Sequence, residues 1–75
     1  MARVILGADV LNLQINGEPR PVEATTIAAL VEELGLDPRK VAVERNLSIV
    51  PRSLHGDTPL VEGDRIELVQ FVGGG

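Results

Sequence analysis

The spacing of the apolar residues changes twice along the chain, and this change limits the fold more than any other feature. Between residues 11 and 15, apolar and polar residues alternate, which is the two-residue period of a strand with one buried face. Between residues 27 and 34, apolar residues recur at intervals of three and four, which places them on one side of a helix. Between residues 65 and 72 the alternation returns. The chain therefore places a helix between strands.

A hairpin is predicted near the start of this plan. The first strand is followed at once by Asn16-Gly17, a pair that favours a tight hairpin turn because both positions tolerate a positive φ. The return strand is expected around residues 20–24. Pro19 and Pro21 have no N–H to donate to a neighbouring strand, so we expect this strand at an edge of the sheet or bent there.

The helical segment predicts about two turns with recognisable ends. Thr25 or Thr26 can cap the first turn with a side-chain oxygen. Gly35 can end the helix in the left-handed conformation, and Pro38 keeps the residue before it out of the helical region.

The second half of the chain predicts three more strands. The β-branched run at 41–45 predicts one strand, and residues 49–50 predict a short one stopped by Pro51. Residues 52–61 contain glycine and proline and predict an irregular surface loop. The last strand is expected at 65–72, after a tight turn.

The order strand, strand, helix, strand, strand, strand predicts the fold class. It is the plan of an α+β protein with the ubiquitin-like β-grasp fold, in which a mixed sheet has one main helix packed across it. By analogy with that fold, the first and last strands pair in parallel at the centre of the sheet. We expect an N-terminal extension at residues 1–9, one β-grasp domain at 10–72 and a flexible glycine tail at 73–75.

Composition excludes several classes of function. The chain has no cysteine, which excludes disulfide scaffolds, thiolate metal sites and cysteine nucleophiles. His55 is the one histidine, and its loop predicts a solvent-exposed side chain rather than a metal ligand. A net charge of −4 argues against a nucleic-acid partner. Because no segment approaches the ~20 apolar residues of a membrane span, we expect a cytoplasmic protein with no membrane partner.

The last three residues, Gly73, Gly74 and Gly75, cannot pack against anything and reach ~10 Å when extended. A frayed end is the simpler interpretation of such a run. Here, however, the glycines follow an apolar strand directly, with no polar linker between them. This arrangement suits a carboxylate that is delivered into a narrow channel of a partner.

The last strand also predicts a docking surface. Val69 and Phe71 alternate with Ile66 and Leu68, so they face away from the side of the sheet that the helix covers. A second buried layer is one explanation for them. The explanation that we favour is a partner docking patch of Val69, Phe71 and Val72 beside the tail.

Several short motifs resemble those of one known family, the sulfur-carrier proteins of thiamine biosynthesis, which are small relatives of ubiquitin in fold. The resemblance covers about residues 10–75. The matching pieces are Asn16-Gly17, Val43-Glu44-Arg45-Asn46, Ile49-Val50-Pro51-Arg52, Glu62-Gly63-Asp64 with Ile66, and the ending Phe71-Val72-Gly73-Gly74-Gly75.

The resemblance implies a function for the tail. An ATP-dependent adenylyltransferase would adenylate the Gly75 carboxylate, and a persulfide sulfur donor protein would convert it to a thiocarboxylate. That sulfur would pass to thiazole synthase, which builds the thiazole ring. The chain itself would bind no cofactor and supply no catalytic residue, so the resemblance implies a carrier and not an enzyme.

Two other functions remain open from the sequence. The small subunit of molybdopterin synthase shares the tail chemistry, but its tail usually has a proline close before the glycine pair, and residues 65–74 contain none. A ubiquitin-like protein modifier would be activated in the same way. High-molecular-weight adducts would indicate a modifier, whereas a thiocarboxylate on the free protein would indicate a carrier.

Overall fold

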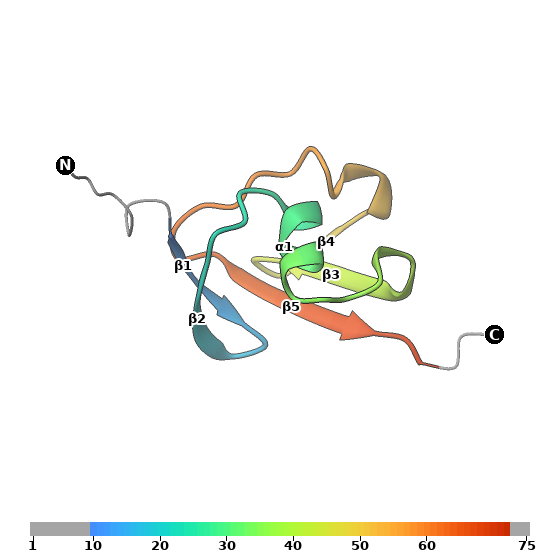
Figure 1. The fold of residues 1–75 in the computed structure, drawn as a ribbon, viewed down its shortest axis with the longest axis horizontal. Helices are drawn as coiled ribbons and strands as arrows, with labels where there is room; N and C mark the ends of the chain where they lie inside the picture. Colours follow the sequence, from blue (N-terminus) through green and yellow to red (C-terminus); the bar gives the residue numbers. More distant parts are fainter. Residues whose placement is uncertain (1–9, 73–75) are drawn as a thin grey trace.

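The computed structural model describes residues 10–72, which form a five-stranded mixed sheet with one α-helix packed across one face (Figure 1). The strand order in the sheet is β2-β1-β5-β3-β4. The elements along the chain are β1 (Leu11–Ile15), β2 (Glu18–Val22), α1 (Ile27–Glu33), η2 (Pro38–Lys40), β3 (Val41–Arg45), β4 (Ser48–Val50), η3 (Arg52–Leu54) and β5 (Arg65–Gln70). The predicted α+β architecture is confirmed. The extension predicted at 1–9 and the tail predicted at 73–75 lie outside the described residues.

The first hairpin forms through the predicted turn. Asn16 and Gly17 have φ values of 52° and 86°, and β2 starts directly after them, two residues earlier than predicted. Pro19 and Pro21 lie opposite Gln14 and Asn12 in β2, which is an edge strand as expected. The main chain of Gln14 faces β5, because its N–H donates to Asp64 O at 2.9 Å. The prolines therefore occupy positions where β1 needs no donor, which explains why β2 tolerates them.

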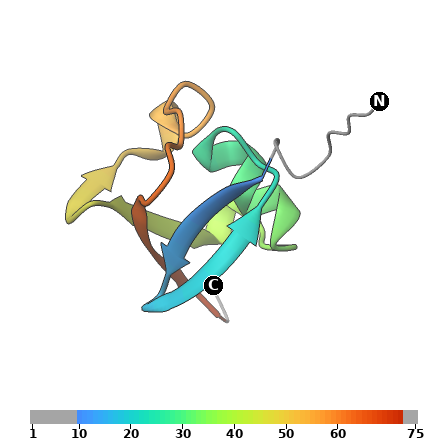
Figure 2. The same ribbon diagram turned by 90° about the vertical axis from the view of Figure 1, so that its left-hand side faces the viewer.

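The helix has the predicted ends and provides one face of the core. Thr26 is the N-cap, and its side-chain oxygen accepts a hydrogen bond from Ala29 N at 3.1 Å. Gly35 follows the helix with a φ of 75°. Figure 2 shows the helix on one side of the twisted sheet. The buried apolar core consists of Leu13, Ile15, Val22, Ala24, Ile27, Leu30, Val31, Val41, Val43, Leu60, Ile66 and Leu68.

The last strand, β5, lies at the centre of the sheet. It pairs in parallel with β1 and antiparallel with β3, as predicted from the fold analogy. It ends at Gln70, two residues earlier than expected, because β3 begins at Val41, its partner residue. One further main-chain hydrogen bond, from Phe71 N to Lys40 O at 2.7 Å, extends the contact beyond the strand.

The prediction of an exposed His55 is wrong. Its side chain is buried, with 5% of its surface exposed, and Nε2 lies 3.0 Å from Val50 O. Because a carbonyl oxygen only accepts, Nε2 carries the proton of this hydrogen bond. The short helix η3 turns the loop back toward α1, where the His55 carbonyl accepts from Ala28 N at 2.9 Å. The ring is therefore part of the packing between the loop and β4.

Candidate docking surface and tail

The structure places Val69 on the face of the sheet opposite the helix, and it leaves Phe71 and Val72, which follow β5, exposed. Val69 and Phe71 are 58% and 49% exposed, and Val72 is exposed as well. Ile66 and Leu68 are buried on the helix side, as the alternation predicts. No second layer of the described residues covers this face, which leaves Val69, Phe71 and Val72 accessible.

Two residues that the sequence analysis missed extend this surface. Leu47 and Ile49, from the turn between β3 and β4 and from β4, are 79% and 75% exposed. Both line a shallow hollow of about 450 Å³ together with Val69. Ile49 and Phe71 line a second, smaller hollow next to it. We call the surface formed by Leu47, Ile49, Val69, Phe71 and Val72 the open-face patch.

The start of β5 is fixed by a polar cluster around Asp64. This carboxylate is buried and accepts hydrogen bonds from Arg45 Nε at 2.8 Å, Asn46 Nδ2 at 3.0 Å and the main-chain N–H of Val61 at 2.9 Å. Burial by itself would raise the pKa of Asp64, but the hydrogen bonds from Arg45, Asn46 and Val61 outweigh it and lower the pKa below its ordinary value. The ionised carboxylate thus joins the turn after β3 to the loop before β5.

The middle of β5 is fixed by Asn16. Its Oδ1 accepts from Leu68 N at 2.8 Å, and its Nδ2 donates to Leu68 O at 3.3 Å. Asn16 N also donates to Ile66 O at 2.9 Å. The strand that leads to the tail is therefore held on both sides as far as Leu68, and by β3 as far as Gln70.

The described residues offer little else for chemistry. Within 10–72, no group of three or more His, Asp or Glu side chains is arranged to hold a metal ion. None of the helices in this part of the chain is long and apolar enough to cross a membrane. The tail predicted to enter the partner, Gly73, Gly74 and Gly75, lies outside the described residues, and so does the predicted site of modification at Gly75.

The sheet order, the helix across it and the central last strand leading to glycines define a ubiquitin-like β-grasp protein. More specifically, the chain belongs to the ThiS family, whose model matches residues 13–75. This confirms the resemblance on which the sequence analysis relied.

Individual relatives agree with this assignment. The sulfur carrier protein ThiS of Thermus thermophilus is 39% identical over 61 residues, which are 81% of this chain and 95% of the relative. The crystal structure of the thiamine biosynthesis protein ThiS from Geobacter metallireducens has a TM-score of 0.74 and 30% identity, and the match covers 87% of this chain and 100% of that one.

A third relative is much longer than this chain. The thiazole synthase of Paramagnetospirillum magneticum is 53% identical over 66 residues, which are 87% of this chain. The same residues are 20% of that relative, so the chain spans about a fifth of its length.

Proposed function

We propose that this chain is a sulfur carrier for thiamine biosynthesis and that the sulfur travels on the carboxyl carbon of Gly75. The observation that carries the proposal is the course of β5. This strand is fixed by Asp64, by Asn16 and by β3, and it leads directly to three glycines. A rigid strand with a tail that has no side chains suits a carboxylate that must enter a narrow site on an enzyme.

The chemistry begins with activation of the carboxylate. A C-terminal carboxylate has a pKa of about 3.3–3.7 and is ionised at neutral pH, so it is a poor electrophile. An ATP-dependent adenylyltransferase would couple Gly75 to AMP with release of pyrophosphate. The terminal sulfur of a persulfide on a donor protein would then attack the carbonyl carbon and displace AMP. A thiol would cleave the resulting acyl disulfide, becoming oxidised to a disulfide with the donor, and would leave the thiocarboxylate on Gly75.

The comparisons support the thiamine branch and one of the partners. The ThiS family match extends over the tail, which favours thiamine biosynthesis over molybdopterin synthesis. A region similar to this chain occurs within a polypeptide named thiazole synthase, which supports thiazole synthase as the acceptor of the sulfur. The adenylyltransferase and the persulfide donor follow from the chemistry of the carboxylate.

The carrier in this proposal is a co-substrate and not an enzyme. The open-face patch would dock on the adenylyltransferase while the tail enters its active site, because these apolar residues are exposed next to the tail. The chain would bind no cofactor of its own, and ATP and the persulfide would be bound by its partners. Because activation consumes ATP, the carrier would act in the cytoplasm.

Intact-mass measurement tests this proposal. The chain is incubated with ATP, the adenylyltransferase and a persulfide donor, and its mass is expected to rise by the difference between sulfur and oxygen. A Gly74→Ala variant should react far more slowly, because the added methyl meets a channel shaped for glycine. The matched control is Gly56→Ala, since a Cβ at Gly56 meets no atom within 4 Å and its φ is not positive. An unchanged mass, or equal rates for the two variants, would contradict the proposal.

A further inference from the structure

The two strands that flank β5 pair with different lengths of it. On one side, β3 pairs with β5 up to Gln70. On the other side, β1 pairs with it at Arg65 and Ile66, and the chain then turns away at Asn16. Among residues 10–72, the end of β5 therefore has a neighbouring strand on one side alone.

The Asn16 side chain lies beside Leu68, where the next residue of β1 would lie if that strand continued along β5. Its amide offers Leu68 one acceptor and one donor, which is what a main-chain peptide group would offer. Main-chain groups of a strand point to alternate sides with a two-residue period. The main-chain groups of Ile66 and Leu68 form hydrogen bonds on the β1 side of β5, whereas the N–H of Phe71 donates to Lys40 O on the opposite side. The N–H and C=O of Gln70 therefore point toward the β1 side, beyond the end of β1.

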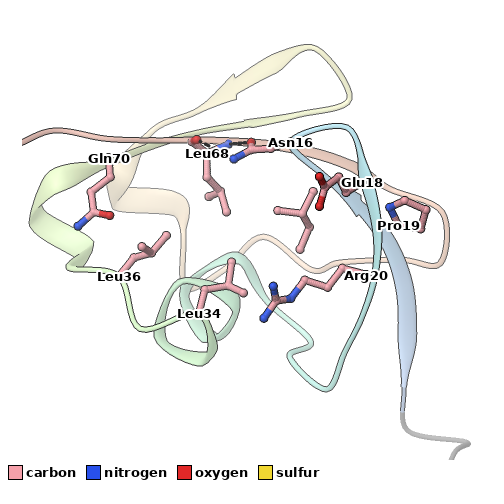
Figure 3. A pocket seen from close by; sticks show the side chains of 9 residues that line it. Asn16, Glu18, Pro19, Arg20, Leu34, Leu36, Leu68 and Gln70 are labelled. Carbon is pink, nitrogen blue, oxygen red and sulfur yellow. Dashed lines mark hydrogen bonds between the residues drawn. The ribbon is translucent and has the colours of Figure 1, made fainter.

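A groove lined both by leucines and by the polar residues Asn16, Glu18, Arg20 and Gln70 lies beside this unpaired edge, on the helix side of the sheet (Figure 3). Its volume is about 540 Å³. Leu34, Leu36 and Leu68 point into it, and Gln70 lies at its end toward the tail. The side chains of a strand placed next to Gln70 would alternate in direction, and every second side chain would enter this groove.

We propose that an extended segment of the enzyme that activates the tail pairs with β5 at Gln70, in line with β1, and places a side chain against the leucines of the groove. This inference rests on the proposed function. The occupant is an extended main chain because the donor and acceptor of Gln70 are spaced as in a strand, and another strand satisfies both. The occupant belongs to the activating enzyme because a protein that holds Gly73, Gly74 and Gly75 lies within ~10 Å of this edge. The main-chain bonds would hold the end of β5 in register with the active site.

A proline at position 70 tests the pairing. Gln70→Pro removes the N–H that faces the empty side and leaves the bond from Phe71 N to Lys40 O in place. Proline is tolerated at a strand edge whose N–H has no partner, so the variant should fold. We expect the KM of the adenylyltransferase for the carrier to rise about tenfold, with kcat unchanged, because one bond is lost and an enzyme carbonyl is left unpaired. Gln70→Ala keeps the N–H, so its KM should rise less than that of Gln70→Pro; an equal rise would show that the side chain and not the main-chain bond is recognised.

Amide hydrogen exchange of the native chain gives a second measurement, which decides the matter if Gln70→Pro does not fold. The Gln70 amide should exchange fast in the free carrier and much more slowly when the adenylyltransferase is added. If the native chain is adenylated but neither the KM nor the Gln70 exchange rate changes, the strand pairing is wrong and the carrier function stands. If the native chain is not adenylated, both fail. Protection that rises with carrier concentration alone would show a second copy at this edge and would overturn the assignment.

Discussion

Truncation of Phe71 tests whether its side chain contributes mainly to docking on the adenylyltransferase or to the stability of the fold. Fully burying a phenylalanine side chain contributes up to about 3 kcal/mol, and Phe71 is 49% exposed, so its buried half contributes about 1.5 kcal/mol. Phe71→Ala should therefore cost about 1–1.5 kcal/mol of unfolding free energy, against about 3–5 kcal/mol for a fully buried phenylalanine. If the adenylyltransferase covers the exposed half, a similar amount is lost from binding, which weakens the Kd about five- to tenfold.

Two assays on the same variant measure these quantities. Denaturant unfolding gives the stability, and calorimetric titration with the adenylyltransferase gives the Kd. The matched control is Val61→Ala, because Val61 is also 49% exposed and lies in the loop before β5, at the other end of the strand from the tail. The control should lose some stability and bind normally. A Kd unchanged by Phe71→Ala, or a stability loss above about 3 kcal/mol, would refute the docking argument.

Two further variants test the anchor of β5 and the length of the tail. Asp64→Asn removes the charge from a carboxylate that holds three donors and should cost about 2–3 kcal/mol at pH 7 in denaturant unfolding. The pKa of Asp64 is lowered in the folded state, so its contribution to the free energy of unfolding is complete above the unfolded pKa of about 3.9 and is lost as the pH falls through the folded pKa. The stabilities of the native chain and of Asp64→Asn should therefore converge in acid. Deleting Gly75 withdraws the carboxylate by about 3.5 Å and should slow thiocarboxylate formation about 100-fold by intact mass, whereas an unchanged rate would show that the site does not measure tail length.

The features that the sequence predicted well depend on neighbouring residues. Asn16 and Gly17 adopt the positive φ values of a hairpin turn, and Thr26 and Gly35 end the helix, because their own side chains or the lack of one decide the local backbone. The exposure of Val69 followed from alternation along a single strand. Each of these needs no knowledge of distant parts of the chain.

The features that were missed depend on contacts between distant segments. Asn16 holds Leu68 across 52 positions of the sequence, and nothing near Asn16 indicates that its side chain acts as a strand neighbour. His55 is buried because the loop folds back against Val50, which the glycine and proline of the loop do not reveal. The ends of β2 and β5 were each two residues off, because a strand ends where its partner ends.

The most direct test of the carrier function follows the sulfur into the product. The chain is converted to the thiocarboxylate with isotopically labelled sulfur and mixed with thiazole synthase and its other substrates. The label is expected to leave Gly75 and to appear in the thiazole, with the unmodified carboxylate regenerated on the carrier. An unlabelled thiazole would contradict the carrier function. Loss of the label from Gly75 with attachment of this chain to lysines of other proteins would also contradict it, because that is the reaction of a protein modifier.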